Sequence, residues 1–408
     1  MLSREASYAN ALFNMTLEYC KENSINPFPR LERLDISSMP AANRSFSLAL
    51  LPLVSTRRLR LRFPLNITPE LEPDHITFFN RVMELSSHVE DLVLYGHSAK
   101  IASIKASTTC LSLMTNLRSF EIDSLLVDQA VLSSLSTLPK LQKLSWHIPP
   151  SQTLPLEKAI GRFPQLTKVN GGSSDIEHPL FIIRSLPRNQ IEDLRLKLSL
   201  DEADDDELVS LCRAIVELGD KSLKIIHIEF EKPQEYYFDS LEPLTACAEL
   251  MDLKITVTRA SDLIIDDTDL NTIAQRLKKL QYIQLGPYQG DRGTTNITLD
   301  SLDSLALHCP DIHYIGLFIL NFELRDLHRN NSRFTNDMTF EFFDSPLEEE
   351  DVFPVSFHLA AMCRPSSGRP PTVVRCRGYE WKQVRDKVKM LHSFMEGERT
   401  WGKLNARG

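Results

Sequence analysis

The chain has 408 residues, of which 42% are hydrophobic and 25% are charged, a composition typical of a globular protein with a sizeable core. Its net charge of −9 argues against a general binder of nucleic acid or anionic membranes, because phosphate groups are bound by a concentrated basic field. With 14 glycines and 23 prolines, the sequence disfavours glycine-rich phosphate loops and indicates many boundaries between elements.

Targeting signals are not evident in the sequence. Residues 1–22 lack the basic and apolar stretches of a signal peptide, and no stretch reaches the ~18 apolar residues of a membrane span. None of the 7 cysteines forms a C-x-x-C pair, and several precede an expected strand, where a small buried thiol packs well. We therefore expect a cytoplasmic and/or nuclear protein with reduced cysteines and no membrane partner.

An internal repeat runs along the chain. The pattern apolar-x-x-apolar-x-apolar recurs with starts 24 to 33 residues apart, a spacing that accommodates one strand and one helix in each unit. The clearest copies include Leu31–Ile36, Val89–Leu94 and Ile191–Leu196. In chain order the copies begin at Leu31, Thr56 (a weak copy), Val89, Leu117, Leu141, Leu166 (degenerate), Ile191, Leu223, Leu250, Leu280 and Ile312.

Prolines stand in a fixed register with this repeat. Pro29, Pro139, Pro164 and Pro310 each lie two positions before the first apolar residue of a copy. Proline cannot continue a helix and favours extended neighbours, so each one separates the helix of one unit from the strand of the next. Two independent features in one register predict the same architecture.

The segments between the strands have helical spacing. Apolar residues at i, i+3, i+4 and i+7 predict a helix over Leu208–Ile215, and Ile76–Met83 has similar spacing. Acidic residues open several of these segments, as helix capping and the helix dipole favour. They are Asp74, Asp128, Asp206, Asp269 and Asp300.

These patterns predict an α/β fold, a leucine-rich-repeat solenoid (horseshoe) with a parallel concave β-sheet, outer helices and about eleven to twelve repeats. We expect the array over residues 1–320, followed over 321–408 by an irregular insertion and a C-terminal capping repeat or helix, with helices at Phe353–Cys363 and Tyr379–Phe394 and a strand at Thr372–Cys376. Consecutive strands of one continuous sheet should bury Leu34, Leu92, Phe120, Leu144, Leu194, Ile226, Leu253, Ile283 and Ile315.

The repeats resemble those of fungal F-box/leucine-rich-repeat proteins. The resemblance rests on the [Phe/Leu/Cys]-Pro-x-[Leu/Ile] lead into a strand, as in Cys309-Pro310-Asp311-Ile312, on the long strand–helix units, and on Trp381-Lys-Gln-Val384 before the last helix. It implies a substrate receptor of a cullin-type ubiquitin ligase. In that family an F-box ahead of the repeats binds the ligase adaptor, whereas here the repeats begin within about the first 30 residues. An adaptor partner is therefore expected only if an F-box exists outside this chain.

Strand alternation places every second residue of each copy on the concave face. Aromatic and arginine side chains are the types that anchor protein interfaces, so we expect a protein partner there. The alternative is a merely solvated face. The candidate partner-binding residues are Arg58, Arg60, Arg62, Tyr95, His147, Arg195, His227, Lys254, Tyr282, Tyr314 and Phe318.

Two parts of this face carry particular expectations. Arg58, Arg60 and Arg62 share one face and could bind a carboxylate or phosphate, or form a solvated edge. Tyr282, Tyr314 and Phe318, next to Lys254 and His227, form an aromatic patch near the end of the array. A partner could cover this patch, or the chain's own segment after residue 321 could.

Other chemistry is not supported by the sequence. The acidic run Asp201–Glu207 lacks the glycine and final glutamate of an EF-hand, and His308, Cys309 and His313 lack a fourth zinc ligand. No catalytic or phosphate-binding motif is found, and the acidic, asparagine-bearing surface of leucine-rich-repeat GTPase activators cannot be mapped. We expect no enzyme activity, no cofactor, no metal site and no nucleic-acid partner.

The sequence therefore predicts a non-catalytic protein–protein recognition module. The resemblance favours the substrate-binding part of an F-box-type ubiquitin-ligase receptor. The alternative is a free-standing leucine-rich-repeat scaffold or inhibitor unrelated to ubiquitin.

Overall fold

The computed structural model divides into two compact units, which are described separately. The first comprises Met1–Ser173 with Arg184–Pro187, and the second Ser174–Ile183 with Arg188–Gly408. The structure describes residues 15, 16, 18–20, 22, 23, 25, 31–37, 57–62, 88–95, 111–123, 129–147, 163–200, 204–232, 234–258, 262–287, 295–319, 322, 333–343, 345–363, 372–374 and 379–405.

The first unit is a parallel sheet with its strands in chain order. Each strand pairs with the next in strict register, for example Leu92 with Phe120 and Phe120 with Leu144. Helix α5 spans Gln129–Ser136, and the described residues between 15 and 22 include helical ones, whereas the helix expected at Ile76–Met83 lies outside the described residues. The strands are β1 (Arg33–Ser37), β2 (Arg58–Arg62), β3 (Asp91–Tyr95), β4 (Ser119–Asp123), β5 (Lys143–His147) and β6 (Lys168–Ser173).

The second unit repeats this architecture. Its main sheet is parallel in the order β7-β8-β10-β12-β13-β14-β15, and a separate parallel pair joins β9 to β11. The main strands are β7 (Asp193–Leu198), β8 (Ile225–Phe230), β10 (Asp252–Val257), β12 (Tyr282–Pro287), β13 (Tyr314–Leu317), β14 (Thr339–Glu341) and β15 (Thr372–Val374). The short pair comprises β9 (Glu235–Tyr237) and β11 (Asp262–Ile264).

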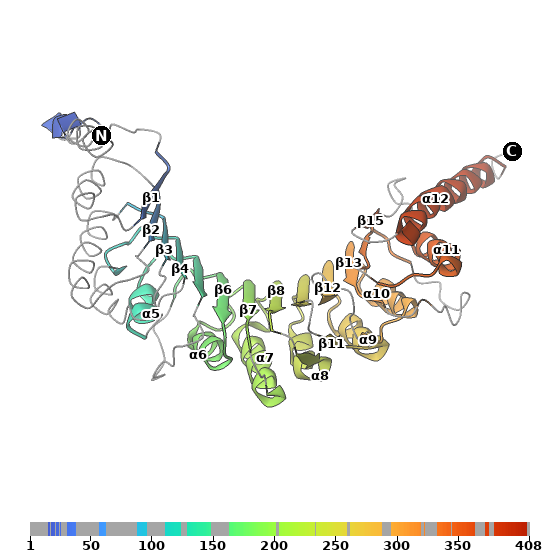
Figure 1. Cartoon of the computed structure of the whole chain (residues 1–408), viewed down its shortest axis with the longest axis horizontal. Helices are drawn as coiled ribbons and strands as arrows, with labels where there is room; N and C mark the ends of the chain where they lie inside the picture. Colours follow the sequence, from blue (N-terminus) through green and yellow to red (C-terminus); the bar gives the residue numbers. More distant parts are fainter. Residues whose placement is uncertain are drawn as a thin grey trace, which may run out of the picture. The chain divides into compact units, whose positions relative to one another are not determined.

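Helices line one side of this second sheet (Figure 1). They are α7 (Asp205–Gly219), α8 (Phe238–Leu241), α9 (Asp267–Arg276), α10 (Leu302–His308), α11 (Val352–Met362) and α12 (Tyr379–Asn405), with 3-10 turns η3 (Glu242–Ala246), η4 (Leu299–Ser301) and η5 (Glu349–Asp351). Helix α6 (Glu177–Ser185) contributes residues to both units. Where the structure describes a whole repeat, it holds one strand and one helical segment, which defines a leucine-rich-repeat solenoid with an α/β fold.

The core consists of the apolar positions of the repeat. The strands of the second unit alternate as expected, and Leu194, Ile226, Leu253, Ile283 and Ile315 are all buried under the helices. In the first unit Leu92, Phe120 and Leu144 are buried, as is Leu59 of the weak copy. Leu34 was expected to be buried but is only half-buried. It lies on the edge strand β1, which has β2 as its only partner among the described strands.

Helices α7 and α9 begin at acidic residues, but two to three positions earlier than the pattern suggested, whereas the turn at Asp300 has Thr298 as its N-cap. Asp204 is the N-cap of α7 and accepts a hydrogen bond from the Asp206 backbone N–H. Asp266 caps α9, accepts from the Thr268 and Asp269 backbone N–H groups, and forms a capping box with Asp269. Asp206 and Asp269 therefore lie in the first turn, where they stabilise the helix dipole. Asp74 and Asp128 lie outside the described residues.

The sheet continues beyond residue 320. Strand β14 was not expected from the sequence, whereas β15, α11 and α12 were. Helix α12 packs onto this end through Trp381, whose indole N–H donates to the Ser345 carbonyl at 2.9 Å and whose ring stacks on Phe342. The aromatic residues of this segment close the core of the last repeats.

The described cysteines are buried free thiols, as expected. Cys212, Cys247, Cys309 and Cys363 lie in successive parts of the second unit. Burial raises the pKa of the thiols of Cys247, Cys309 and Cys363 to about 12. Cys309 Sγ lies 3.5 Å from the Leu277 carbonyl oxygen, so it packs against the previous repeat. Cys110 and Cys376 lie outside the described residues.

Candidate interaction face

The face of the second sheet opposite the helices, here called the open face, carries two rows of side chains. Parallel pairing in register places equivalent residues of neighbouring strands side by side. The first row contains Asp193, Ile225, Asp252, Tyr282, Tyr314 and Thr339. The second row contains Arg195, His227, Lys254, Gln284, Gly316 and Glu341.

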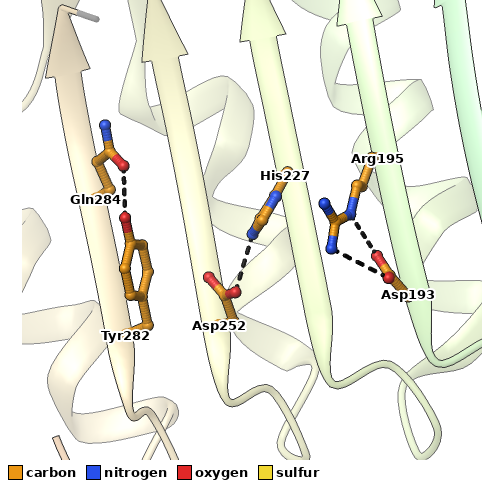
Figure 2. A network of polar contacts seen from close by, with 6 residues as sticks. All are labelled: Asp193, Arg195, His227, Asp252, Tyr282 and Gln284. Atoms are coloured by element: carbon orange, nitrogen blue, oxygen red, sulfur yellow. Dashed lines mark hydrogen bonds and ion pairs between the residues drawn. The ribbon is translucent and has the colours of Figure 1, made fainter. Parts of the chain in front are cut away.

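Ion pairs characterise one end of this face, on β7, β8 and β10, which we call the charged end. Arg195 donates from Nε and Nη2 to the two carboxylate oxygens of Asp193, at 2.9 and 3.2 Å (Figure 2). His227 Nε2 lies 3.0 Å from Asp252 Oδ2, an ion pair when the imidazole is protonated. Asp252 Oδ1 is buried and has no hydrogen-bond partner within the described part of the chain.

A further pair lies beside them. Lys197 Nζ is 2.8 Å from Glu231 Oε1 and 3.8 Å from Glu229 Oε1. The hydrogen bond to Glu231 raises the pKa of Lys197, because it favours the charged ammonium form. With this pair, acidic and basic groups of the charged end neutralise one another.

Aromatic rings characterise the other end, on β12, β13 and β14, which we call the aromatic end. Tyr282 and Tyr314 stack with ring centroids 4.1 Å apart and an interplanar angle of 6°. The Tyr282 hydroxyl donates to Gln284 Oε1 at 2.7 Å, and the Tyr314 hydroxyl contacts the carboxylate of Glu341. Burial, followed by hydrogen bonds with Glu341 and Tyr282, raises the pKa of Tyr314 above its usual range, so the phenol stays protonated.

Small residues let the rings lie close to the sheet. A Cβ atom at Gly316 would lie 3.1 Å from Gln284 Cγ, 3.2 Å from the Tyr314 ring and 3.4 Å from the Phe343 ring. Gly286 has φ +121°, a conformation that glycine adopts readily, and also lies beside Phe343. Phe343 itself has φ 44° and is buried. The Tyr314 ring therefore lies close to the backbone at Gly316, next to the buried Phe343 that follows β14. Both rings of the Tyr282–Tyr314 pair remain half-exposed.

A polar depression adjoins the aromatic end, where β12, β13 and β14 begin. It has a volume of ~620 Å³. Its wall is anchored by Asn336, whose Nδ2 donates to the carbonyls of Pro310 and Ile312 at 3.1 and 3.2 Å. The backbone N–H groups of His313 and Tyr314 both donate to the Gln281 carbonyl. The lining residues are Gln281, Asp311, His313, Asn336 and Asp337.

The structure groups five of the expected site residues on this open face: Arg195, His227, Lys254, Tyr282 and Tyr314. Others belong to the first unit. There Arg58 forms an ion pair with Asp91 at 3.1 Å, and the Arg60 guanidinium lies 6.0 Å from the centre of the Tyr95 ring. The exposed His147 lies over Gly172. The side chain of Arg62 lies outside the described residues.

Phe318 was expected on this face, and that expectation was wrong. It follows the last residue of β13 and is only 1% exposed. Its backbone carbonyl accepts from Thr295, and the next residue, Ile319, donates its N–H to Ser345 Oγ at 2.8 Å. The strand has ended by this point, so alternation no longer places the ring on the open face. Phe318 is therefore buried, with Gly286 of β12 beside it, whereas Tyr282 and Tyr314 keep an exposed part.

Glu341 and Phe343 of the aromatic end were not found by sequence reasoning. They belong to β14 and the residues after it, where the repeat pattern is lost among Met338, Phe340 and Phe342. The alternation of Phe340 and Phe342 around Glu341 was the available signal, but it does not match the leucine pattern.

Among the described residues, no group of three or more His, Cys, Asp or Glu side chains could hold a metal ion. Cys309, which neighbours His308 and His313 in the sequence, contacts backbone carbonyls of the previous repeat. Within the described part of the chain, no helix combines the length and apolar character needed to cross a membrane.

Comparisons with known proteins add little. No family model and no curated protein matches the sequence. A chain of the yeast Rad7–Elc1 complex aligns at 10% identity and a TM-score of 0.42, covering 93% of this chain and 96% of that chain. An internalin (inlF) of Listeria monocytogenes aligns at 13% identity and a TM-score of 0.41, covering 88% and 85%. Both scores are low, so the fold assignment rests on the strand register of this chain.

Proposed function

We propose that this chain is a non-catalytic protein-recognition module and that the open face of the second unit binds a partner protein. The observation that carries this proposal is the Tyr282–Tyr314 pair, stacked and held by hydrogen bonds yet half-exposed on the uncovered side of the sheet. Ordered aromatic side chains that still present apolar area are the usual anchors of protein interfaces, because little entropy is lost when they are buried.

The finer proposal is a substrate-binding part of an F-box-type ubiquitin-ligase receptor in the cytoplasm or nucleus. It is supported by the repeat lead Cys309-Pro310-Asp311-Ile312 and by Trp381, which packs the last helix onto the solenoid. The second candidate is a free-standing scaffold or inhibitor. The two differ in one measurable respect, since only the first requires co-purification of the native protein with a cullin-ligase adaptor.

The test of partner binding uses the whole chain as bait. Proteins captured from a lysate are quantified for the wild type, for Tyr282→Ala and for the matched control Tyr237→Ala. Tyr237 is an exposed tyrosine whose hydroxyl donates to Glu235, and it lies on β9, outside the main sheet. We expect a specific protein to be depleted by Tyr282→Ala alone. Equal capture by all three baits would contradict the proposal.

A further inference from the structure

We infer that a second copy of this chain binds to the end of the second unit that α11 and α12 form. Each of these helices keeps an exposed strip of charged and apolar side chains, and the two strips carry opposite charge. In the dimer, the acidic strip of one copy lies against the basic strip of the other. The acidic strip comprises Glu348, Glu349, Glu350, Phe353 and Phe357, and the basic strip comprises Lys382, Arg385, Lys389, Met390 and Phe394.

The acidic strip runs from η5 directly into α11. Helical spacing places Glu350, Phe353 and Phe357 on one face, because residues three and four apart are neighbours on a helix. The two phenylalanine rings stack with centroids 6.5 Å apart, and the residues are 55% and 44% exposed. The other side of α11 is buried through Val355 and Leu359. The strip therefore presents ordered apolar area next to carboxylates.

The basic strip lies along α12. Val388 and His392 are buried on the inner side of this helix, whereas the side chains of the strip are exposed. Met390 is 61% exposed and Phe394 is 64% exposed. Of the ten large hydrophobic side chains that are exposed among the described residues, four lie on α11 and α12. Exposed apolar area is therefore concentrated on these two helices, as is usual at an interface.

The two strips do not neutralise each other within one chain. Residues 345–363 include four carboxylates and no lysine or arginine, whereas residues 380–394 include four lysine or arginine residues and two carboxylates. Arg385 Nε lies 3.8 Å from Asp386 Oδ1. Among the described residues, neither the three glutamates of the acidic strip nor Lys382 and Lys389 have an ion-pair partner. Each strip therefore offers charge that a second molecule can match.

A second copy fits both strips at once. Helices α11 and α12 pack against each other, so the strips are neighbours in each molecule. A two-fold axis brings the acidic strip of each copy against the basic strip of the other, and the same contact then forms twice. A partner with charge of one sign would be attracted by one strip and repelled by the other. Nucleic acid or an anionic membrane would meet the same opposition from the acidic strip.

The experiment measures the mass of the full chain by sedimentation equilibrium at increasing concentration. We expect a dimer whose dissociation constant rises about tenfold or more in each of two charge-reversal variants, because like charges at an interface oppose association. The first variant is Glu349→Lys with Glu350→Lys, and the second is Lys382→Glu with Lys389→Glu. All four residues are exposed, so folding should be retained, and the melting temperature checks this.

Mixing the two variants gives the decisive measurement. In the first variant both strips are mainly basic, and in the second both are mainly acidic, so neither variant pairs well with itself. An equimolar mixture combines strips of opposite charge in both contacts and should form the dimer again. Loss of folding could not produce this recovery. A mixture that stays monomeric would overturn the inference.

A matched control reverses two other exposed lysines of the helix layer. Lys221 and Lys278 follow α7 and α9 and have no ion-pair partner among the described residues. Lys221→Glu with Lys278→Glu changes the net charge as much as the second variant does, and should leave the dimer unchanged. Equal weakening by this control would show a general effect of charge and count against the strips. A wild-type chain that stays monomeric at every concentration would refute the dimer itself.

Discussion

The two ends of the open face use the same register positions for different purposes. At the charged end, first-row Asp193 is bound by second-row Arg195, and Asp252 lies against His227. At the aromatic end, the same rows hold the stacked pair of Tyr282 and Tyr314, with Gln284 behind it. The two ends do not differ in the backbone pairing of their strands.

This difference indicates where recognition is concentrated. Exposed ion pairs within one face already satisfy each other, so a partner gains little by replacing them and must remove their water. Stacked rings offer apolar area at a fixed position. The charged end therefore supports the sheet, whereas the aromatic end presents the more distinctive surface.

The largest loss of stability should come from a substitution that unfolds the charged end and the aromatic end together. Leu253→Asp places a charge at a position that is 2% exposed between the sheet and the helices. The expected loss of unfolding free energy is about 3 to 5 kcal/mol, because the charge has no partner there. Urea denaturation followed by circular dichroism measures it. Lys254→Gln, the next residue but on the open face, is the control and should change stability by less than about 1 kcal/mol.

Truncating one side chain at each end of the open face should separate the contributions of the two ends to stability. Tyr314→Ala removes the stack and leaves the mostly buried Glu341 without the tyrosine hydroxyl, at an expected cost of about 2 to 4 kcal/mol. Arg195→Ala should cost about 1 to 2 kcal/mol, since the arginine is 47% exposed but its loss leaves the buried Asp193 without its bidentate partner. The comparison would be wrong if urea denaturation gave the two variants equal losses.

Substitution of a glycine at the aromatic end tests how tightly the side chains around it are packed. Gly316→Ala should cost about 1 kcal/mol, because Gln284 and Phe343 are buried and cannot easily move away from the new methyl group. Gly172→Ala is the control in the first unit, where a Cβ would meet the His147 ring at 2.2 Å. His147 is exposed and can rotate away, so we expect the closer contact to be the less costly. The melting temperatures of both variants show which substitution costs more stability.

A loss of stability at acid pH should come from His358 in the helix layer rather than from the charged end or the aromatic end. Burial lowers the pKa of His358 in α11, although Asp303 and Asp300 oppose this shift. Below 6.5, the unfolded chain takes up a proton that the folded chain resists, so stability rises with pH across this window, by at most about 1.4 kcal/mol per pH unit. His358→Gln should flatten that part of the profile, measured by urea titrations at several pH values. An unchanged slope would contradict this assignment.

The smallest effect is expected at the charged end. Lys197→Gln removes an exposed pair with Glu231 and should cost no more than about 0.5 kcal/mol, and less in high salt. Because the pKa of Lys197 is raised, the pair stabilises the fold below the unfolded value of 10.5 and is lost as pH rises through the folded value. Denaturation at low and high salt measures the difference, which should vanish in the latter.

The fold could be predicted from the sequence because each repeat carries the apolar pattern of its own strand. The buried residues of β3 to β13 coincide with the apolar positions of the copies, and Pro310 and its equivalents mark where the strands begin. Strand β14 could not be predicted in the same way. Phe340 in this strand and Phe342 just after it fill the core positions as a stacked pair of buried rings, so the leucine pattern is not kept there.

The candidate site could be predicted only in part. Strand alternation places Tyr282, Tyr314 and Arg195 on the open face, because it depends on the backbone alone. The contacts that distinguish the two ends are between residues distant in sequence, such as Tyr314 with Glu341. Phe318 was misplaced for a related reason, since where a strand ends depends on what packs beyond it.

The buried thiols of the second unit provide a means of timing its motions. A thiol with a pKa of about 12, such as that of Cys309 or Cys363, has almost no thiolate at neutral pH and reacts with alkylating reagents only after exposure. Cys212 and Cys247 are buried in earlier repeats. The order in which these four thiols become labelled under native conditions would therefore show whether the repeats open one by one from an end or all at once.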